Sequence, residues 1–162
     1  MSVRVQREDF DIAAEVRRLT TGRTDIGAVV TFTGIVRGES RGGPLTAMTL
    51  EHYPGMTEAE LETVEAEAGR RWPLQASLVV HRIGDLRPGD NIVLVVTASA
   101  HREAAFAAAE FLMDYLKTRA PFWKKERDAD GSERWVDARD SDDRAAERWD
   151  ASPPPPARAR RA

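Results

Sequence analysis

Cysteine is absent from this sequence of 162 residues, and histidine occurs only three times. The chain therefore forms no disulfide, carries no thiolate nucleophile and offers no cysteine-based metal site. The histidines, at positions 52, 81 and 101, show neither the HExxH nor the HxH spacing of a metal site. We expect no metal and no cofactor, and any sulfur that this protein handles must be carried by another molecule.

The sequence also lacks a strong excess of charge, a long apolar run and the common nucleotide and hydrolase motifs. Its 24 lysines and arginines nearly balance its 27 acidic residues, so bulk charge does not recruit nucleic acid or a membrane. No apolar run approaches the roughly 18 residues of a membrane helix, and the first residues lack the apolar core of a secretory signal. A P-loop, a GxGxxG fingerprint and a GxSxG elbow are absent. We expect a cytoplasmic protein that binds neither nucleic acid nor membrane.

The composition indicates one globular domain followed by a tail. The chain is 41% hydrophobic and 31% charged, which is typical of a soluble domain with its own core. We predict this single domain over residues 1–150. Residues 151–162 read ASPPPPARARRA, a composition that cannot build a core, and we predict that this tail is disordered.

Residue patterns predict a mixed order of helices and strands. The β-branched run 27–36 is a strong strand signal, and the run 91–98 is apolar enough to be buried on both faces of a sheet. A capping-box pattern from Thr57 to Glu60 opens the second helix, and the glycine-rich segment 37–44 is predicted to be a mobile loop. The predicted helices are 10–19, 57–71, 101–118 and 140–149, and the strands are 27–36, 45–53, 75–83, 91–98, 123–127 and 134–136. Because helices and strands do not strictly alternate, we predict an α+β fold.

The most unusual segment is 113–125, MDYLKTRAPFWKK, in which cations surround an apolar and aromatic run. Pro121 ends the preceding helix, because it lacks an N–H group and disfavours helix for the residue before it. Two interpretations of Lys117 are open. It is either a solvated lysine that stabilises the helix dipole, or a buried lysine among other cations that acts as acid, base or nucleophile.

Three further sites carry cations that could serve a substrate or only solubility. Lys124 and Lys125 would point to opposite faces of a strand, and Lys124 is the better candidate for a pocket, although lysines are common on edge strands. His101-Arg102 lies at a strand-to-helix junction, where free N–H groups and the helix dipole favour an anion. A solvated pair at a helix start explains His101-Arg102 equally well. Arg37 could reach the same anion or be a solvated loop residue.

Five segments carry a resemblance to a known family. They are VVTFTGIVR (29–37), LEHYPGMTE (50–58), HRIGDLRPGD (81–90), SAHR (99–102) and MDYLKTRAPFWKKE (113–126). Together they resemble the MoaE family, the large catalytic subunits of molybdopterin synthase. The resemblance runs from about residue 27 to residue 149, and the strings LKTRAPFWK and LEHYPGM are long and unusual.

The resemblance implies a fold, partners and a reaction. The fold would be of the α/β-hammerhead type with an added α+β subdomain, and two large subunits would form a central homodimer within a heterotetramer. Each would bind a small ubiquitin-like sulfur-carrier subunit, whose C-terminal Gly-Gly thiocarboxylate enters a pocket of the large subunit. The enzyme would add two sulfurs to cyclic pyranopterin monophosphate and form the dithiolene of molybdopterin. A chain without cysteine fits this scheme, because the partner brings the sulfur.

The resemblance also assigns residues to roles. Lys117 and Lys124 match the catalytic lysines, and Arg139 matches an arginine that acts across the dimer. Phe32, Phe122 and Trp123 would line the channel for the carrier's tail. The full substrate-binding set that the resemblance implies is Ile35, Val36, Arg37, His101, Arg102, Lys117, Lys124, Lys125, Glu126 and Arg139.

Two other functions use some of the same residues. A non-catalytic α+β adaptor would hold the tail of a ubiquitin-like partner with the basic, aromatic hairpin, but it would not need Arg37 or His101-Arg102 as an anion site. A protein that binds single-stranded nucleic acid would use the lysines and aromatic residues. The net charge of −3 argues against nucleic-acid binding.

Overall fold

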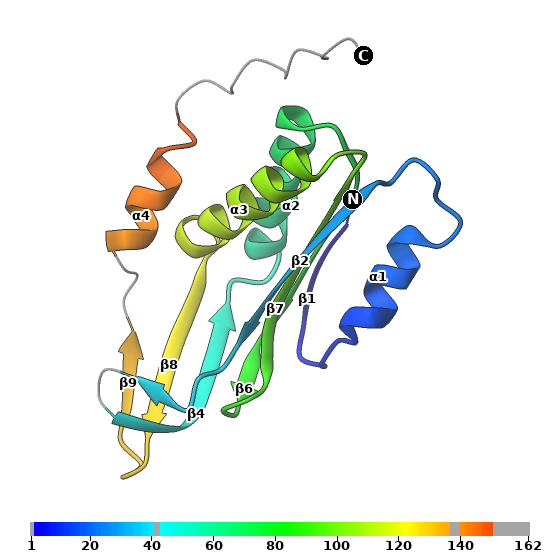
Figure 1. Cartoon of the computed structure of the whole chain (residues 1–162). Helices are drawn as coiled ribbons and strands as arrows, with labels where there is room; N and C mark the ends of the chain where they lie inside the picture. The colour runs from blue at the N-terminus through cyan, green and yellow to red at the C-terminus, as the bar shows by residue number, and fades with distance from the viewer. Residues whose placement is uncertain (1, 41–42, 137–139, 151–162) are drawn as a thin grey trace.

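The computed structural model describes residues 2–40, 43–136 and 140–150, and it contains two β-sheets and four helices (Figure 1). Arg139 and the tail 151–162, for which the sequence made predictions, lie outside the described residues. Within the described ranges, no helix is long and apolar enough to cross a membrane.

The first sheet has four strands and is covered by helices on both faces. Its order is β1 (Ser2–Gln6), β5 (Leu74–Arg82), β7 (Asn91–Ser99) and β2 (Ala28–Ile35). β1 runs parallel to β5, and the other pairs are antiparallel. Helix α1 (Ile12–Thr20) lies on one face, whereas α2 (Met56–Arg71) and α3 (Arg102–Thr118) lie on the other (Figure 1). The central strands β5 and β7 are therefore largely buried, which confirms the prediction for 91–98.

Alternating side chains of β5 and β7 form a separate apolar core on each face of the first sheet, because successive residues of a strand point to opposite sides. The cluster under α1 contains Phe10, Leu78, Val80, Leu94 and Val96. The cluster under α2 and α3 contains Val79, Val93, Val95, Phe111 and Leu112. Helix α4 (Asp140–Glu147) contacts α3, and Trp149 beyond it packs edge-on against Phe111 at 5.6 Å between ring centroids. The first sheet and its helices thus form the larger part of the described structure.

The second sheet extends beyond the C-terminal end of α3 (Figure 1). Its strands are β3 (Glu39–Ser40), β4 (Gly43–His52), β8 (Phe122–Asp128) and β9 (Glu133–Val136), and β6 (Gly84–Leu86) pairs with β4. A third apolar cluster joins this sheet to the start of β7 through Val36, Met48, Leu50, Leu86 and Ile92. β8 and β9 form the predicted hairpin, which places the segment after Pro121 opposite the end of α3.

The structure confirms the α+β prediction and corrects several elements. The short strands β1, β3 and β6 were not predicted, and β3 occupies part of the segment expected to be a mobile loop. The capping box from Thr57 to Glu60 is wrong, because α2 begins one residue earlier and Glu58 accepts a hydrogen bond from the backbone N of Gly55 at 2.7 Å. The Thr57 hydroxyl instead donates to the carbonyl of Pro121 at 3.2 Å, which fixes the entry to β8.

Candidate active site

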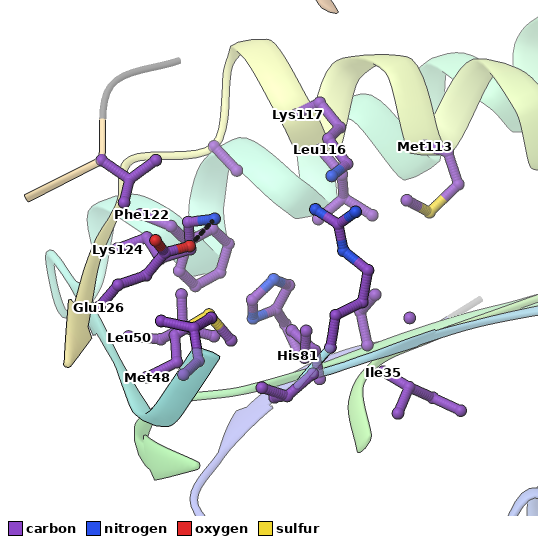
Figure 2. A pocket seen from close by; sticks show the side chains of 18 of the residues that line it. Ile35, Met48, Leu50, His81, Met113, Leu116, Lys117, Phe122, Lys124 and Glu126 are labelled. Carbon is purple, nitrogen blue, oxygen red and sulfur yellow. Dashed lines mark ion pairs between the residues drawn. The ribbon is translucent and has the colours of Figure 1, made fainter. Parts of the chain in front are cut away.

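A cavity of about 470 Å³ lies where the two sheets meet the C-terminal end of α3 (Figure 2). The polar side chains that line it are Arg37, Glu39, His81, Lys117, Lys124 and Glu126. The apolar lining includes Phe32, Ile35, Met48, Leu50, Met113 and Phe122. The lining of the cavity therefore combines several charged side chains with apolar ones, and these residues come from both sheets and one helix.

Lys117 reaches the cavity from the last turn of α3. The helix ends at Thr118, and the backbone N of Phe122 donates to the carbonyl of Ala120 at 2.8 Å in the turn that leads into β8. The side chain of Lys117 is exposed rather than buried, and it has no ion-pair partner within the part of the chain that the structure describes. Of the two open interpretations of Lys117, the exposure excludes the buried one, and the ammonium group is available to a ligand in the cavity.

Lys124 reaches the cavity from β8 and is paired with Glu126 on the same face of that strand. Its Nζ lies 3.0 Å from Oε1 of Glu126, and the Glu126 side chain is only 7% exposed. Burial raises the pKa of Glu126, but hydrogen bonds from Lys124, Ser40 and Arg134 outweigh burial and hold that pKa below its ordinary value. Glu126 is thus an anion that fixes the direction of Lys124.

Arg37 follows the end of β2, where the register with β7 is irregular between Gly34 and Ile35. The backbone of Val36 is held on both sides: its N donates to Asp90 at 2.9 Å, and its carbonyl accepts from Gly89 at 2.9 Å. These bonds to the 87–90 turn fix the chain just before Arg37. Ile35, whose side chain is exposed, and Arg37 both line the cavity.

His81 is a cavity residue that the sequence analysis considered only as a metal ligand. Its ring stacks on Phe122 at 3.8 Å between centroids, and Nδ1 donates to the carbonyl of Arg82 at 2.8 Å. Burial, together with a smaller effect of nearby Lys117, lowers the pKa of His81 to about 4. The imidazole is therefore neutral, with Nε2 as a hydrogen-bond acceptor. Strand alternation was the available signal, since His81 and the core residue Val79 point to the same face.

His101 and Arg102 do not reach this cavity within one chain. They lie exposed at the start of α3, whereas Lys117 lies near its end. A helix of 17 residues is about 25 Å long, so Arg37 and this pair cannot hold one small anion in a single chain. The possibility of one shared anion is therefore excluded for a single chain, and the role of His101 and Arg102 in substrate binding stays a prediction.

Trp123 and Lys125 point away from the cavity, because alternate residues of β8 face opposite sides. Lys125 pairs with Glu133 at 3.0 Å and lies 5.7 Å from the ring centroid of Trp135. Trp123 is 48% exposed and, like Lys125, does not line the cavity. In the single chain Trp123 and Lys125 therefore do not line this cavity, and their predicted roles in the tail channel and in substrate binding stay predictions.

The remaining predicted residues are brought together. The cavity is lined by Phe32, Ile35, Val36, Arg37, Lys117, Phe122, Lys124 and Glu126, although their roles stay predictions. In the residues that the structure describes, no group of three or more histidine, aspartate or glutamate side chains could hold a metal ion. Three cations at one cavity suit an anionic substrate and can stabilise negative charge that develops in a reaction.

Fold and cavity together define an α+β protein with a cationic cavity for a small anionic substrate between two sheets. Residues 5–119 match the family model described as MoaE protein. The chain is 62% identical to a molybdopterin synthase catalytic subunit of Mesorhizobium japonicum, over 93% of this chain and 94% of the relative. It is 57% identical to the subunit of that name in Vibrio cholerae, over 91% of this chain and 97% of the relative. The chain belongs to the MoaE family.

Solved structures agree with this family membership. The fold is similar to that of a molybdopterin biosynthesis MoaE protein from Burkholderia ambifaria, with a TM-score of 0.79 and 54% identity over 93% of this chain and 99% of that one. It is also similar to molybdopterin synthase from Staphylococcus aureus, with a TM-score of 0.75 and 33% identity over 82% and 95% of the two chains. The two-sheet architecture is therefore shared with relatives whose sequences differ widely.

Proposed function

We propose that this protein is the catalytic subunit of a molybdopterin synthase. It transfers sulfur from the thiocarboxylated C-terminus of a small sulfur-carrier subunit to cyclic pyranopterin monophosphate and so forms the dithiolene of molybdopterin. The observation that carries the proposal is the gathering of Lys117, Lys124 and Arg37 around one cavity in a MoaE-family chain without cysteine. The relatives are named catalytic subunits, which supports a partner that brings the sulfur. We also propose a cytoplasmic location, which cell fractionation tests.

The geometry supports a division of roles among the cavity cations. Arg37 suits the cyclic phosphate of the substrate, because a guanidinium binds phosphate through two parallel hydrogen bonds. Lys124, held by Glu126 at 3.0 Å, orients the substrate. Lys117, which has no ion-pair partner among the described residues, transfers protons and stabilises negative charge in two steps. The thiocarboxylate sulfur first bonds to a pterin carbon and forms a thioester with the carrier. Water then cleaves the bond between this sulfur and the carrier's carbonyl carbon, so that the sulfur stays on the pterin and the carrier leaves as a carboxylate. Phe32 and Phe122 flank the path of a narrow Gly-Gly tail.

A matched pair of lysine substitutions tests this division. We expect Lys117→Ala to lower the rate of dithiolene formation by about 10²- to 10⁴-fold, the range typical of a lost proton-transfer group, while binding of the carrier persists. Lys125→Ala on the outer face of β8 serves as the control and should keep the rate within about twofold of the unsubstituted protein, as an exposed ion pair contributes little. A near-normal rate for Lys117→Ala would exclude its catalytic role, and an adaptor would show carrier binding without product in every variant.

His101 and Arg102 enter the proposal only through a second copy of the chain, because α3 separates them from the cavity of their own copy. In a two-fold dimer, each copy can supply them to the other's cavity. If Lys117→Ala and Arg102→Ala are each inactive, mixing and reassociating them should restore about a quarter of the full activity, because half of the dimers are mixed and each has one intact site. An absence of recovery in verified mixed dimers would show that Arg102 serves its own copy or no site.

A further inference from the structure

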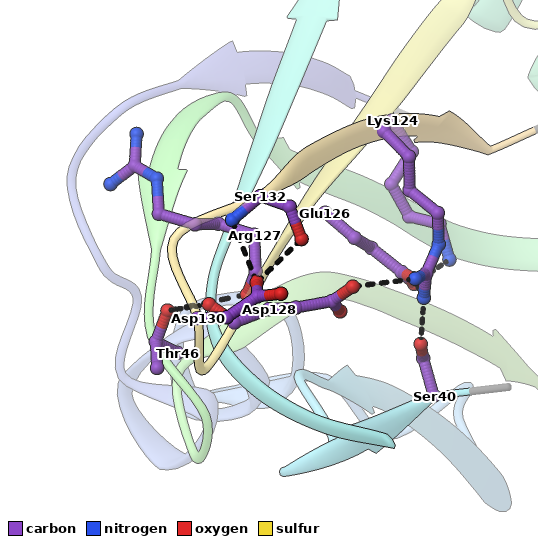
Figure 3. A network of polar contacts seen from close by, with 9 residues as sticks. Ser40, Thr46, Lys124, Glu126, Arg127, Asp128, Asp130 and Ser132 are labelled. Carbon is purple, nitrogen blue, oxygen red and sulfur yellow. Dashed lines mark hydrogen bonds and ion pairs between the residues drawn. The ribbon is translucent and has the colours of Figure 1, made fainter. Parts of the chain in front are cut away.

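Arg134 on β9 contacts side chains of β8 and β3 in the second sheet. Figure 3 shows the polar network to which its partners Ser40, Glu126 and Asp128 belong. Its Nη2 lies 2.8 Å from Oε2 of Glu126, and its Nη1 lies 2.8 Å from Oδ2 of Asp128. The same Nη2 also donates a hydrogen bond to the hydroxyl of Ser40 on β3. One planar guanidinium thus links β8, β9 and the short strand that follows Arg37, an arrangement that a point charge cannot reproduce in full.

The contact with Glu126 reaches the cavity directly. Glu126 and Arg134 are cross-strand neighbours in the β8–β9 hairpin, and the two oxygens of the buried Glu126 carboxylate face two different cations. Arg134 takes Oε2, so that Oε1 is left for Lys124 at 3.0 Å. Without Arg134 the carboxylate would lose the cation at Oε2 and would be held by Lys124 and the Ser40 hydroxyl alone.

Arg134 itself does not line the cavity, so it acts through its neighbours. The groups around Glu126 are Lys124 and Asp128 from its own strand, Arg134 from β9, Ser40 from β3, and the apolar Met48 opposite it on β4. Glu39 from β3 lines the same cavity. Lys124 and Arg134 are the cations in this set. The loss of Arg134 therefore leaves one cation to balance a buried carboxylate.

We propose that Arg134 is a positioning residue of the active site, which directs Lys124 through Glu126 and fixes the chain after Arg37 through Ser40. The proposal rests on the proposed function, because Lys124 and Arg37 matter only if the cavity is the site of sulfur transfer. The contacts of Arg134 support this role. One is with Glu126, which holds Lys124, and another is with Ser40, which lies on the short strand after Arg37.

The test compares Arg134→Gln with Arg127→Gln in the complete complex, with the thiocarboxylated carrier and the cyclic pterin. Arg127 lies in the same hairpin and pairs with Glu133 at 2.6 Å, away from Glu126. We expect Arg134→Gln to lower kcat by about ten- to a hundred-fold, as small misplacements in active sites do, whereas Arg127→Gln stays within about twofold. Arg134→Lys should recover part of the loss, because a single ammonium replaces the charge but not both directions of the fork.

The pH profile separates positioning from mere stability. Loss of Arg134 removes one group that lowers the pKa of Glu126, while burial still raises it. The acid limb of kcat should therefore move to higher pH in Arg134→Gln and, less far, in Arg134→Lys, but not in Arg127→Gln. Combined with Glu126→Gln, Arg134→Gln should cause little further loss.

Three results would overturn the proposal. Arg134→Gln could match Arg127→Gln in kcat, its acid limb could remain in place while only its melting temperature falls, or its effect could persist in full beside Glu126→Gln. If Arg134→Gln does not fold, the acid limb of kcat is measured for Arg134→Lys instead, and an unshifted limb in that variant would overturn the proposal. Failure of the proposed function is distinct, because the unsubstituted complex would then form no dithiolene at all.

Discussion

At the scale of single residues, the cavity combines one held lysine, one lysine available to a ligand and one neutral histidine. Glu126 fixes Lys124, whereas Lys117 has no ion-pair partner within the described residues. His81 is stacked on Phe122 beside them. This arrangement keeps one cation fixed for orientation and another able to follow charge as it moves during a reaction.

His81 gives a prediction about stability and pH. Its pKa is about 4 in the folded protein and 6.5 in its ordinary state, so the unfolded chain binds a proton that the folded chain does not. The contribution of neutral His81 to the free energy of unfolding is present above pH 6.5 and is lost as the pH falls toward 4. Between pH 7 and pH 5 we expect His81→Phe, which cannot titrate, to lose about 2 kcal/mol less unfolding free energy than the unsubstituted protein. Denaturant unfolding at both pH values measures this difference, and parallel losses would contradict it.

At the scale of elements, the close approach of β2 to the start of α3 is set by Gly27. A Cβ at this position would collide with the carbonyl oxygen of Ala100, which is backbone and cannot turn aside. The backbone N of Gly27 also donates to Ser99 at 3.0 Å. The first residues of β2 and the junction before α3 are therefore locked together.

We expect Gly27→Ala to destabilise the protein by about 1–3 kcal/mol, the usual cost of overpacking. Gly38→Ala is the matched control, because the nearest atom to its Cβ would be Cβ of Pro88 at an ordinary 4.0 Å. Thermal unfolding of both variants checks the prediction. Equal melting temperatures for Gly27→Ala and Gly38→Ala would show that the backbone at this junction accommodates the added Cβ without loss of stability.

Long, continuous patterns made some elements predictable from sequence, whereas others depend on distant partners. β7 and α3 were predicted almost to the residue because each has an uninterrupted pattern of its own. β1 has five residues and is defined by parallel pairing with β5, more than seventy positions away in sequence. β6 has three residues and exists only beside β4. No local pattern reports such pairing.

Two sources, strand alternation and the family resemblance, predicted part of the site from the sequence. Alternation correctly separated Lys124 from Lys125, and it should also have excluded Trp123. The resemblance grouped His101 with Lys117, but it did not reveal that the length of α3 separates them in one chain. Arg134 was missed, because its contacts with Glu126 and Ser40 arise only when the hairpin and β3 pack together.

At the scale of the whole molecule, the described chain is anchored as far as Asp150. Trp149 packs against Phe111, its indole N–H donates to Asp114 at 2.7 Å, and its carbonyl accepts from Arg71 at 2.8 Å. Asp150 accepts a hydrogen bond from the hydroxyl of Tyr115 at 3.2 Å. The proposed single domain therefore extends through this contact with α2 and α3.

Truncation locates the end of the domain. A chain that ends at Asp150 should keep the melting temperature and activity of the full chain, because the composition of residues 151–162 cannot build a core. A chain that ends at Glu147 also loses Trp149 and should be less stable by about 1–3 kcal/mol, because the partly buried indole packs against the core cluster and against Phe111. Thermal unfolding of the two truncated chains checks this, and equal stability would place the boundary before Trp149.

The origin of the sulfur tests the central claim most directly. The purified protein is mixed with a carrier whose thiocarboxylate holds isotopically labelled sulfur, with cyclic pyranopterin monophosphate and with unlabelled sulfide in solution. We predict that both sulfurs of the dithiolene product carry the label, and that Lys117→Ala forms this product about 10²- to 10⁴-fold more slowly. Product with unlabelled sulfur, or no product from the unsubstituted protein with an active carrier, would contradict the account.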